Sequence, residues 1–151
     1  LQRFSFIMND VLIEFNYLDT DFRLKNEPVV SDWLLLCIEH LGVELGDISY
    51  FFCSDEHLLQ INIDALNHDY YTDIISFDYS ALPVISGEIF ISVDRVIENA
   101  SEFNVSFTHE MLRVLSHGIC HFAGFKDKTD LDITKMRAKE DEWLKLFYQS
   151  A

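Results

Sequence analysis

The chain has 151 residues, 49% of them hydrophobic, and its 26 acidic and 11 basic residues give a net charge of −15. The hydrophobic content, with thirteen phenylalanines, excludes a disordered chain, and no apolar run reaches the roughly 18 residues that a membrane helix needs. The strong negative charge argues against nonspecific affinity for nucleic acid.

Apolar periodicity predicts strands and helices along the whole chain. The expected elements are, in order, a strand at 11–17, a helix at 32–41, a strand at 47–53, a helix from Asp55, strands at 72–79 and 88–93, and helices at about 94–103, 108–122 and 130–148. Ser31 and Asp94 are expected to cap two of the helices. This order predicts an α+β fold, a four-stranded sheet packed with about five helices, in a single domain over residues 1–151.

Three cysteines, Cys37, Cys53 and Cys120, form an odd set without CxxC spacing. We expect free, buried thiols, which are typical of a reducing compartment. The start of the chain shows no basic segment followed by an apolar stretch, so no secretory signal is expected. The predicted location is the cytoplasm.

Positive charge is concentrated late in the chain. Residues 1–112 hold 4 basic and 20 acidic residues, whereas residues 113–151 hold 7 basic and 6 acidic residues. The later basic residues include Lys126, Lys128, Lys135, Arg137 and Lys139. They indicate either a phosphate-binding surface or a solvated helix face with partners one turn away.

The segment around His117 and His121 is the strongest candidate for a functional site. In a helix, histidines four residues apart lie on one face, where both rings can reach one metal ion. Gly124 can end the helix in a left-handed conformation and return Asp127 towards the same ion. Two imidazoles and one carboxylate with an open position describe a catalytic metal site. The alternative is an amphipathic helix with two hydrogen-bonded histidines and a glycine cap.

Two neighbours of the histidines bear on the chemistry. Gly118 occupies the position that the general-base glutamate has in HExxH proteases, which counts against peptide or ester hydrolysis. Arg113 lies one turn before His117, where it could meet a phosphate bound at the metal. Alternatively, Arg113 pairs with Glu110 or with a distant carboxylate.

The histidine segment resembles the YbeY family of rRNA-maturation metalloendoribonucleases. The family pattern HGxLHLxGyDH is similar to residues 117–127, HGICHFAGFKD. The resemblance implies that His117 and His121 bind the metal, expected to be zinc, and that Asp127 occupies the position of the third family histidine. It also implies a single-strand-specific endoribonuclease that acts on ribosomal RNA and ribosomal particles.

Other stretches extend this resemblance along nearly the whole chain. They are Leu66-Asn67 with the TDIISF segment at 72–77, the strand at 87–92, the helix from Asp94 to Ala100, and Met136 with Glu140 as a closing MxxxE pattern. Ser76 aligns with a motif serine, and it is either catalytic or a strand hydroxyl bonded to backbone. Between Asn67 and Thr72 the chain is about five residues shorter than the family pattern. The basic cluster expected there is replaced by His68, Tyr70 and Tyr71.

Three hypotheses remain open at this point. The first is RNA hydrolysis through a water bound to the metal, with Arg113 and Lys126 or Lys128 stabilising the phosphate charge. The second is a metal hydrolase of a substrate other than nucleic acid. The third is a ribosome-associated binding factor whose metal is mainly structural.

Overall fold

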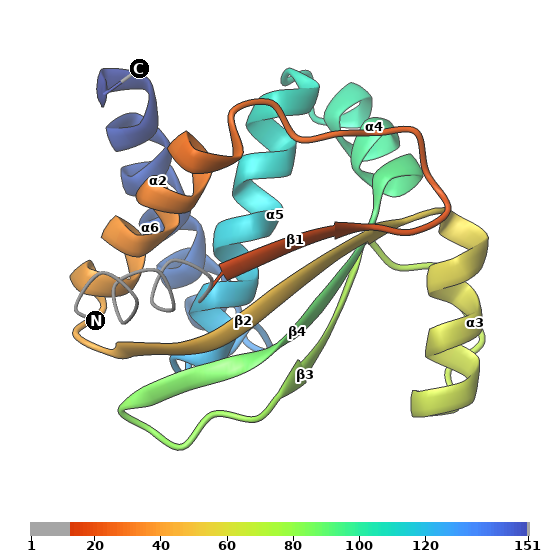
Figure 1. Cartoon of the computed structure of the whole chain (residues 1–151), viewed down its shortest axis with the longest axis horizontal. Coiled ribbons are helices and arrows are strands. Elements are labelled where there is room, and N and C mark those ends of the chain that lie inside the picture. The colour runs from red at the N-terminus through yellow and green to blue at the C-terminus, as the bar shows by residue number, and fades with distance from the viewer. Residues whose placement is uncertain (1–12, 151) are drawn as a thin grey trace, which may run out of the picture.

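The computed structural model describes residues 13–150 and has one four-stranded sheet and five helices in this range (Figure 1). In chain order the elements are β1 (Ile13–Tyr17), α2 (Glu27–His40), β2 (Glu44–Cys53), α3 (Asp55–Leu66), β3 (Ile74–Asp78), β4 (Val84–Ser92), α4 (Val93–Glu102), α5 (Phe107–Phe122) and α6 (Asp130–Ser150). The predicted α+β fold in a single domain is confirmed. None of the described helices is long and apolar enough to cross a membrane.

The sheet has the strand order β1-β2-β4-β3. The β1–β2 and β2–β4 pairs are parallel, whereas β3 runs antiparallel to β4. Parallel neighbours need long connections, and α2 and α3 lie in these two connections. In the register, Tyr50 of β2 and Ser76 of β3 flank Ile89 of β4. β4 is therefore a central strand, and alternate residues along it are buried.

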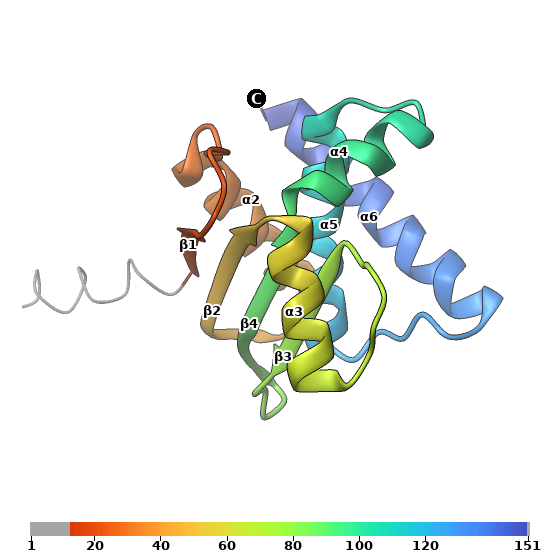
Figure 2. The same cartoon turned by 90° about the vertical axis from the view of Figure 1, so that its right-hand side faces the viewer.

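The two faces of the sheet are covered unequally (Figure 2). The larger core contains side chains of α2, α4, α5 and α6 packed on β2 and β4, with Tyr50, Phe52 and Trp143 almost wholly buried. The opposite face carries a smaller cluster in which Leu58 of α3 packs on Cys53 and Ile75. The helix that carries the histidines thus lies on the thicker side of the molecule.

Helix α5 is the most deeply placed helix of the larger core. Its predicted apolar stripe of Leu112, Leu115, Ile119 and Phe122 is buried, as expected. Gly118 lies where α5 crosses the sheet, and a Cβ at this position would come within 2.7 Å of Cδ1 of Ile89. The glycine after the first histidine therefore permits this close approach of helix and sheet, and a Cβ there would force the side chain of Ile89 to shift.

Several expected boundaries were wrong by a few residues. Ser31 does not cap α2, which begins at Glu27 with Asn26 as its N-cap, because Pro28 is compatible with the first helical turn. Asp94 lies inside α4, and Ser92 is the N-cap, accepting a hydrogen bond from the backbone N–H of Arg95.

Strand ends also differ from those expected. β2 begins at Glu44, three residues before the predicted start, and β3 is shorter than the predicted 72–79. The part of the predicted strand at residues 11 and 12 lies outside the described residues. These shifts leave the order and number of strands unchanged.

Candidate metal centre

Helix α5 positions both histidines through well-defined ends. The hydroxyl of Ser106 caps its start by accepting from the backbone N–H of His109. At its end Gly124 has φ +100°, and the N–H groups of Gly124 and Phe125 bond to the carbonyls of His121 and Cys120, each at 3.0 Å. This Schellman turn reverses the chain, as predicted for Gly124, and returns residue 127 towards the helix.

Three ligand atoms meet beside this turn. Nε2 of His117 lies 3.0 Å from Nε2 of His121, and Oδ2 of Asp127 lies 3.8 Å and 3.4 Å from these two atoms. A tetrahedral zinc ion at its usual bond lengths holds its ligands about 3.4 Å apart. The observed separations bracket this value, so the three residues fit such an ion. Both imidazoles are partly buried, whereas Asp127 is 47% exposed, which leaves one side of the centre open to solvent.

Glu140 holds the ring of His117 from the opposite side. Its Oε2 lies 2.7 Å from Nδ1 of His117, and the carboxylate is almost wholly buried in α6. The Nδ1–H therefore donates to Glu140, and the lone pair of Nε2 faces the centre. Such a carboxylate behind a metal-binding histidine fixes the tautomer and raises the basicity of the ligand.

Arg113 is bound to two buried carboxylates. It donates to both carboxylate oxygens of Glu110 at 3.0 and 2.6 Å, and to Glu140 at 3.2 Å. Burial opposes its charge, but the hydrogen bonds and charges of Glu110 and Glu140 outweigh this and raise the pKa of Arg113. The pairing alternative is thus confirmed. Because only 12% of its side chain is exposed, Arg113 mainly orders Glu140 behind His117.

The electrostatics suit metal binding by imidazole rather than by thiolate. Burial and the neighbouring His117 lower the pKa of His121, so the neutral ring that binds a metal is favoured. Burial raises the pKa of the Cys120 thiol on the same helix to about 12. Cys37 and Cys53 are also free and buried, as predicted. Within residues 13–150, His117, His121 and Asp127 are the one cluster of potential metal ligands.

A small hollow of about 210 Å³ lies beside two of the three ligands, on the side of α6. His117, Asp127 and Glu140 line it together with Arg137, whose side chain is 52% exposed. Nε of Arg137 is 3.9 Å from Glu140, a much looser contact than those of Arg113. Lys126, Lys128 and Lys135 are exposed, and Lys139 pairs with Glu142. Arg137 is therefore an exposed cation that lines the hollow beside His117 and Asp127.

Ser76 and the aromatic residues of the loop after α3 lie away from these ligands in sequence and contacts. Ser76 is in the middle of β3, opposite Ile89, and lines neither the hollow nor the ligand cluster. In the short loop after α3, the rings of His68 and Tyr70 stack with centroids 5.1 Å apart, and Tyr71 donates to Glu56. These aromatic side chains occupy the place of the expected basic cluster without supplying its charge.

Sequence reasoning missed the roles of Glu140 and Arg137. The only signal for Glu140 was its place in the closing MxxxE pattern, which says nothing about the residue it contacts. The pairing of Glu110 with Arg113 follows helical i, i+3 spacing and was one of the stated alternatives. Arg137 was noted only as one member of a basic run.

Comparisons with known proteins agree with this architecture. The family model described as Endoribonuclease YbeY matches residues 15–148. Proteins named Endoribonuclease YbeY from Flavobacterium johnsoniae and Cytophaga hutchinsonii are 53% and 44% identical to this chain. The alignments cover 91% and 92% of it and 98% of each relative.

A solution structure of a Thermotoga maritima protein shares the fold, with a TM-score of 0.64 and 23% identity over 91% of this chain and 90% of that one. The α+β architecture therefore recurs in a protein of quite different sequence. With the family model and the sequence relatives together, the chain belongs to the YbeY endoribonuclease family.

Proposed function

We propose that this chain is a metal-dependent endoribonuclease that cleaves single-stranded RNA during maturation of ribosomal RNA. The observation that carries the proposal is the convergence of His117, His121 and Asp127 at separations suited to one ion, in a chain whose relatives are named endoribonucleases. The proposed ion is zinc, because two of its three ligands are imidazoles. The proposal treats residues 1–151 as one such domain.

The metal, when bound, supplies Lewis-acid activation of a phosphoryl oxygen and of a water molecule. The protein groups provide the rest of the site. Glu140 orients His117 and keeps Nδ1 protonated, and Arg113 in turn holds Glu140. Asp127 completes the ligand set from a loop, so the open side faces solvent and can admit a flexible RNA strand.

The phosphate contact is assigned to Arg137 in this proposal. Arg113 was the candidate from sequence, but its donors are engaged by two carboxylates. Arg137 is exposed at the hollow beside His117 and Asp127, so it can turn towards a bound phosphate without breaking a strong ion pair. Lys126 and Lys128, next to Asp127 in sequence, add positive charge around the same opening.

The expected partners and location follow from the proposed substrate and from the cysteines. Ribosomal particles are the expected partners, since ribosomal RNA is the proposed substrate. The free buried thiols of Cys37, Cys53 and Cys120 support a reducing compartment, and we place the protein in the cytoplasm.

An RNA cleavage assay with metal analysis tests the proposed function. The purified protein should contain about one zinc per chain and should cut single-stranded RNA internally, with little cleavage of a duplex of the same sequence. His117→Ala and His121→Ala should lose both metal and activity. His109→Ala is the matched control, because His109 is on the same helix but outside the ligand cluster. Equal cleavage by the metal-free protein would refute the proposal.

One observation favours a second candidate, a ribosome-associated binding factor with a structural metal. Both buried carboxylates near the centre, Glu110 and Glu140, are engaged by Arg113 or His117, so neither is free to act as a general base. In this case metal removal would lower the melting temperature sharply, while no RNA would be turned over. Retained binding of the histidine variants to ribosomal particles would also favour this candidate.

A further inference from the structure

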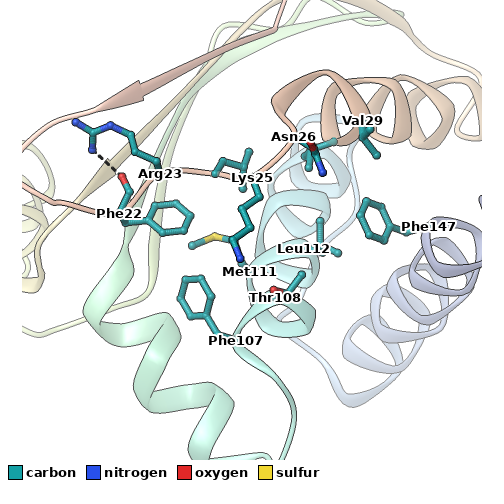
Figure 3. Close-up of a pocket in the computed structure, with 12 residues that line it drawn as sticks. Phe22, Arg23, Lys25, Asn26, Val29, Phe107, Thr108, Met111, Leu112 and Phe147 are labelled. Carbon is teal, nitrogen blue, oxygen red and sulfur yellow. Dashed lines mark hydrogen bonds between the residues drawn. The ribbon is translucent and has the colours of Figure 1, made fainter. Parts of the chain in front are cut away.

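A second and larger pocket lies at the other end of α5 (Figure 3). Its volume of about 660 Å³ falls within the range of roughly 300–1,000 Å³ that is typical of small-molecule sites. The loop before α2, the first turns of α2 and α5, and Phe147 of α6 form its walls. At about 100° per residue, Thr108 and Leu112 lie about 180° and 140° around the helix axis from His117. The pocket therefore opens on the side of α5 opposite the metal ligands.

The interior of this pocket is apolar. Met111 and Leu112 form a buried floor, and Phe22, Phe107 and Phe147 surround it (Figure 3). Phe22 and Phe107 meet edge to face, with ring centroids 5.5 Å apart and an interplanar angle of 69°. These two rings leave no pair of parallel faces between which a planar base could stack. The walls are better suited to a flexible aliphatic group.

The charge at the pocket differs from that of the surrounding chain. Residues 1–112 contain 20 acidic and only 4 basic residues, yet two of these four, Arg23 and Lys25, line the pocket. None of the described lining residues is acidic. Arg23 donates to the carbonyls of Thr20 and Phe22 at 3.0 and 2.7 Å, and its guanidinium lies over the ring of Tyr17, turned away from the pocket interior (Figure 3). Lys25 points into the pocket in Figure 3 and forms no ion pair with any residue in the range 13–150.

We propose that this pocket binds an amphipathic carboxylate, an aliphatic chain that ends in one carboxylate group, as in a fatty acid. The chain lies among the phenylalanines over Met111, and the carboxylate meets the ammonium group of Lys25. A single negative charge is matched by the ammonium group of Lys25, and Arg23 adds positive charge nearby. A polyanionic nucleic acid is not matched, since the rest of residues 1–112 holds 20 acidic and only 2 basic residues.

Isothermal titration of the purified 151-residue chain with dodecanoate, below its micelle concentration, tests the proposal. We expect saturable binding at one site. Dodecanol has the same chain length without the charge and should bind roughly fivefold more weakly, the factor expected for an exposed ion pair worth about 1 kcal/mol. Lys25→Gln should lower the affinity for dodecanoate by a similar factor, and Lys128→Gln, an exposed lysine elsewhere, should not.

Two more variants separate this pocket from the metal centre. Val29→Trp places a large ring at an exposed position of the pocket wall and should block dodecanoate. His117→Ala should bind dodecanoate like the wild type, whatever its activity on RNA. Thermal unfolding followed by circular dichroism checks that each variant is folded.

Three results would overturn the proposal. The first is the absence of saturable binding, and the second is equal affinity for dodecanoate in the wild type, Lys25→Gln and Val29→Trp. The third is displacement of dodecanoate by a single-stranded oligonucleotide or an acidic peptide at comparable concentration, because the pocket would then belong to a macromolecular interface.

Discussion

Glu140→Gln tests the buried carboxylate that joins α6 to the histidine helix. In the wild type, Oε2 accepts from His117 at 2.7 Å and Oε1 accepts from Arg113 at 3.2 Å. Glutamine has nearly the same shape, but its amide is uncharged and only one of its two terminal atoms accepts a hydrogen bond. One of the two contacts is therefore lost, and the other is weakened.

The size of the effect follows from these contacts. Partners that orient metal-bound histidines typically contribute about 10- to 100-fold to metal affinity, so we expect zinc affinity to fall by that factor. Arg113 keeps both hydrogen bonds to Glu110. Because no buried charge is left alone, the free energy of unfolding should fall by only about 1–3 kcal/mol.

Two measurements on the same protein check this expectation. Competition with a chromophoric chelator gives the zinc Kd, and urea unfolding of the metal-free protein gives its stability. Glu142→Gln is the matched control, since Glu142 is on the same helix but exposed, with Lys139 at 3.8 Å as its ion-pair partner. If Glu140→Gln binds zinc as tightly as the wild type, His117 does not depend on a carboxylate to orient its ring, and the reasoning is refuted.

Three further predictions follow from the same contacts. In the metal-free protein, burial lowers the pKa of His121 below its usual value of 6.5. At a pH between the folded pKa and the unfolded pKa of His121, the unfolded chain therefore binds more protons than the folded chain. The free energy of unfolding should be highest above about pH 6.5 and should decrease as the pH falls through the pKa of His121 in the folded protein. If the free energy of unfolding of His121→Asn had the same dependence on pH, it would contradict this prediction. Gly118→Ala places a Cβ 2.7 Å from Cδ1 of Ile89 and should cost about 1–3 kcal/mol in unfolding experiments. Adding Ile89→Val, which removes that methyl group, should recover part of the loss, whereas strictly additive effects would argue against the clash. Arg137→Ala should raise KM for RNA more than it lowers kcat and leave zinc content unchanged; unaltered steady-state kinetics would exclude Arg137 from the phosphate contact.

The parts of the fold that sequence predicted well depend on local signals. Apolar spacing predicts the buried stripe of α5, and Gly124 predicts its end, because a left-handed residue is needed there. The prediction that Ser31 caps α2 was wrong. A serine is only a preferred residue at an N-cap, and Pro28 allows the helix to begin earlier. The short distance between His117 and His121 could be predicted from sequence only because both ligands lie on one helix.

The rest of the site depends on contacts between distant segments. Glu140 is 23 residues from His117, and its side chain reaches the imidazole only because α6 packs against α5. No periodicity within either helix specifies that contact. The same holds for Arg113, whose pairing with Glu110 is local but whose contact with Glu140 is not. Tertiary packing thus decided between the two roles that the sequence allowed for this arginine.

The contact between α5 and α6 also determines when the site is completed during synthesis of the chain. The ribosome adds Glu140 after His117, so a growing chain presents the histidine helix before the carboxylate that orients it has been made. Until α6 emerges and packs, Arg113 also lacks one of its two carboxylate partners. If the chain has the proposed function, its metal centre would therefore be incomplete while the chain is still attached to a translating ribosome. The centre of this nuclease of ribosomal RNA would assemble only near the end of its own synthesis.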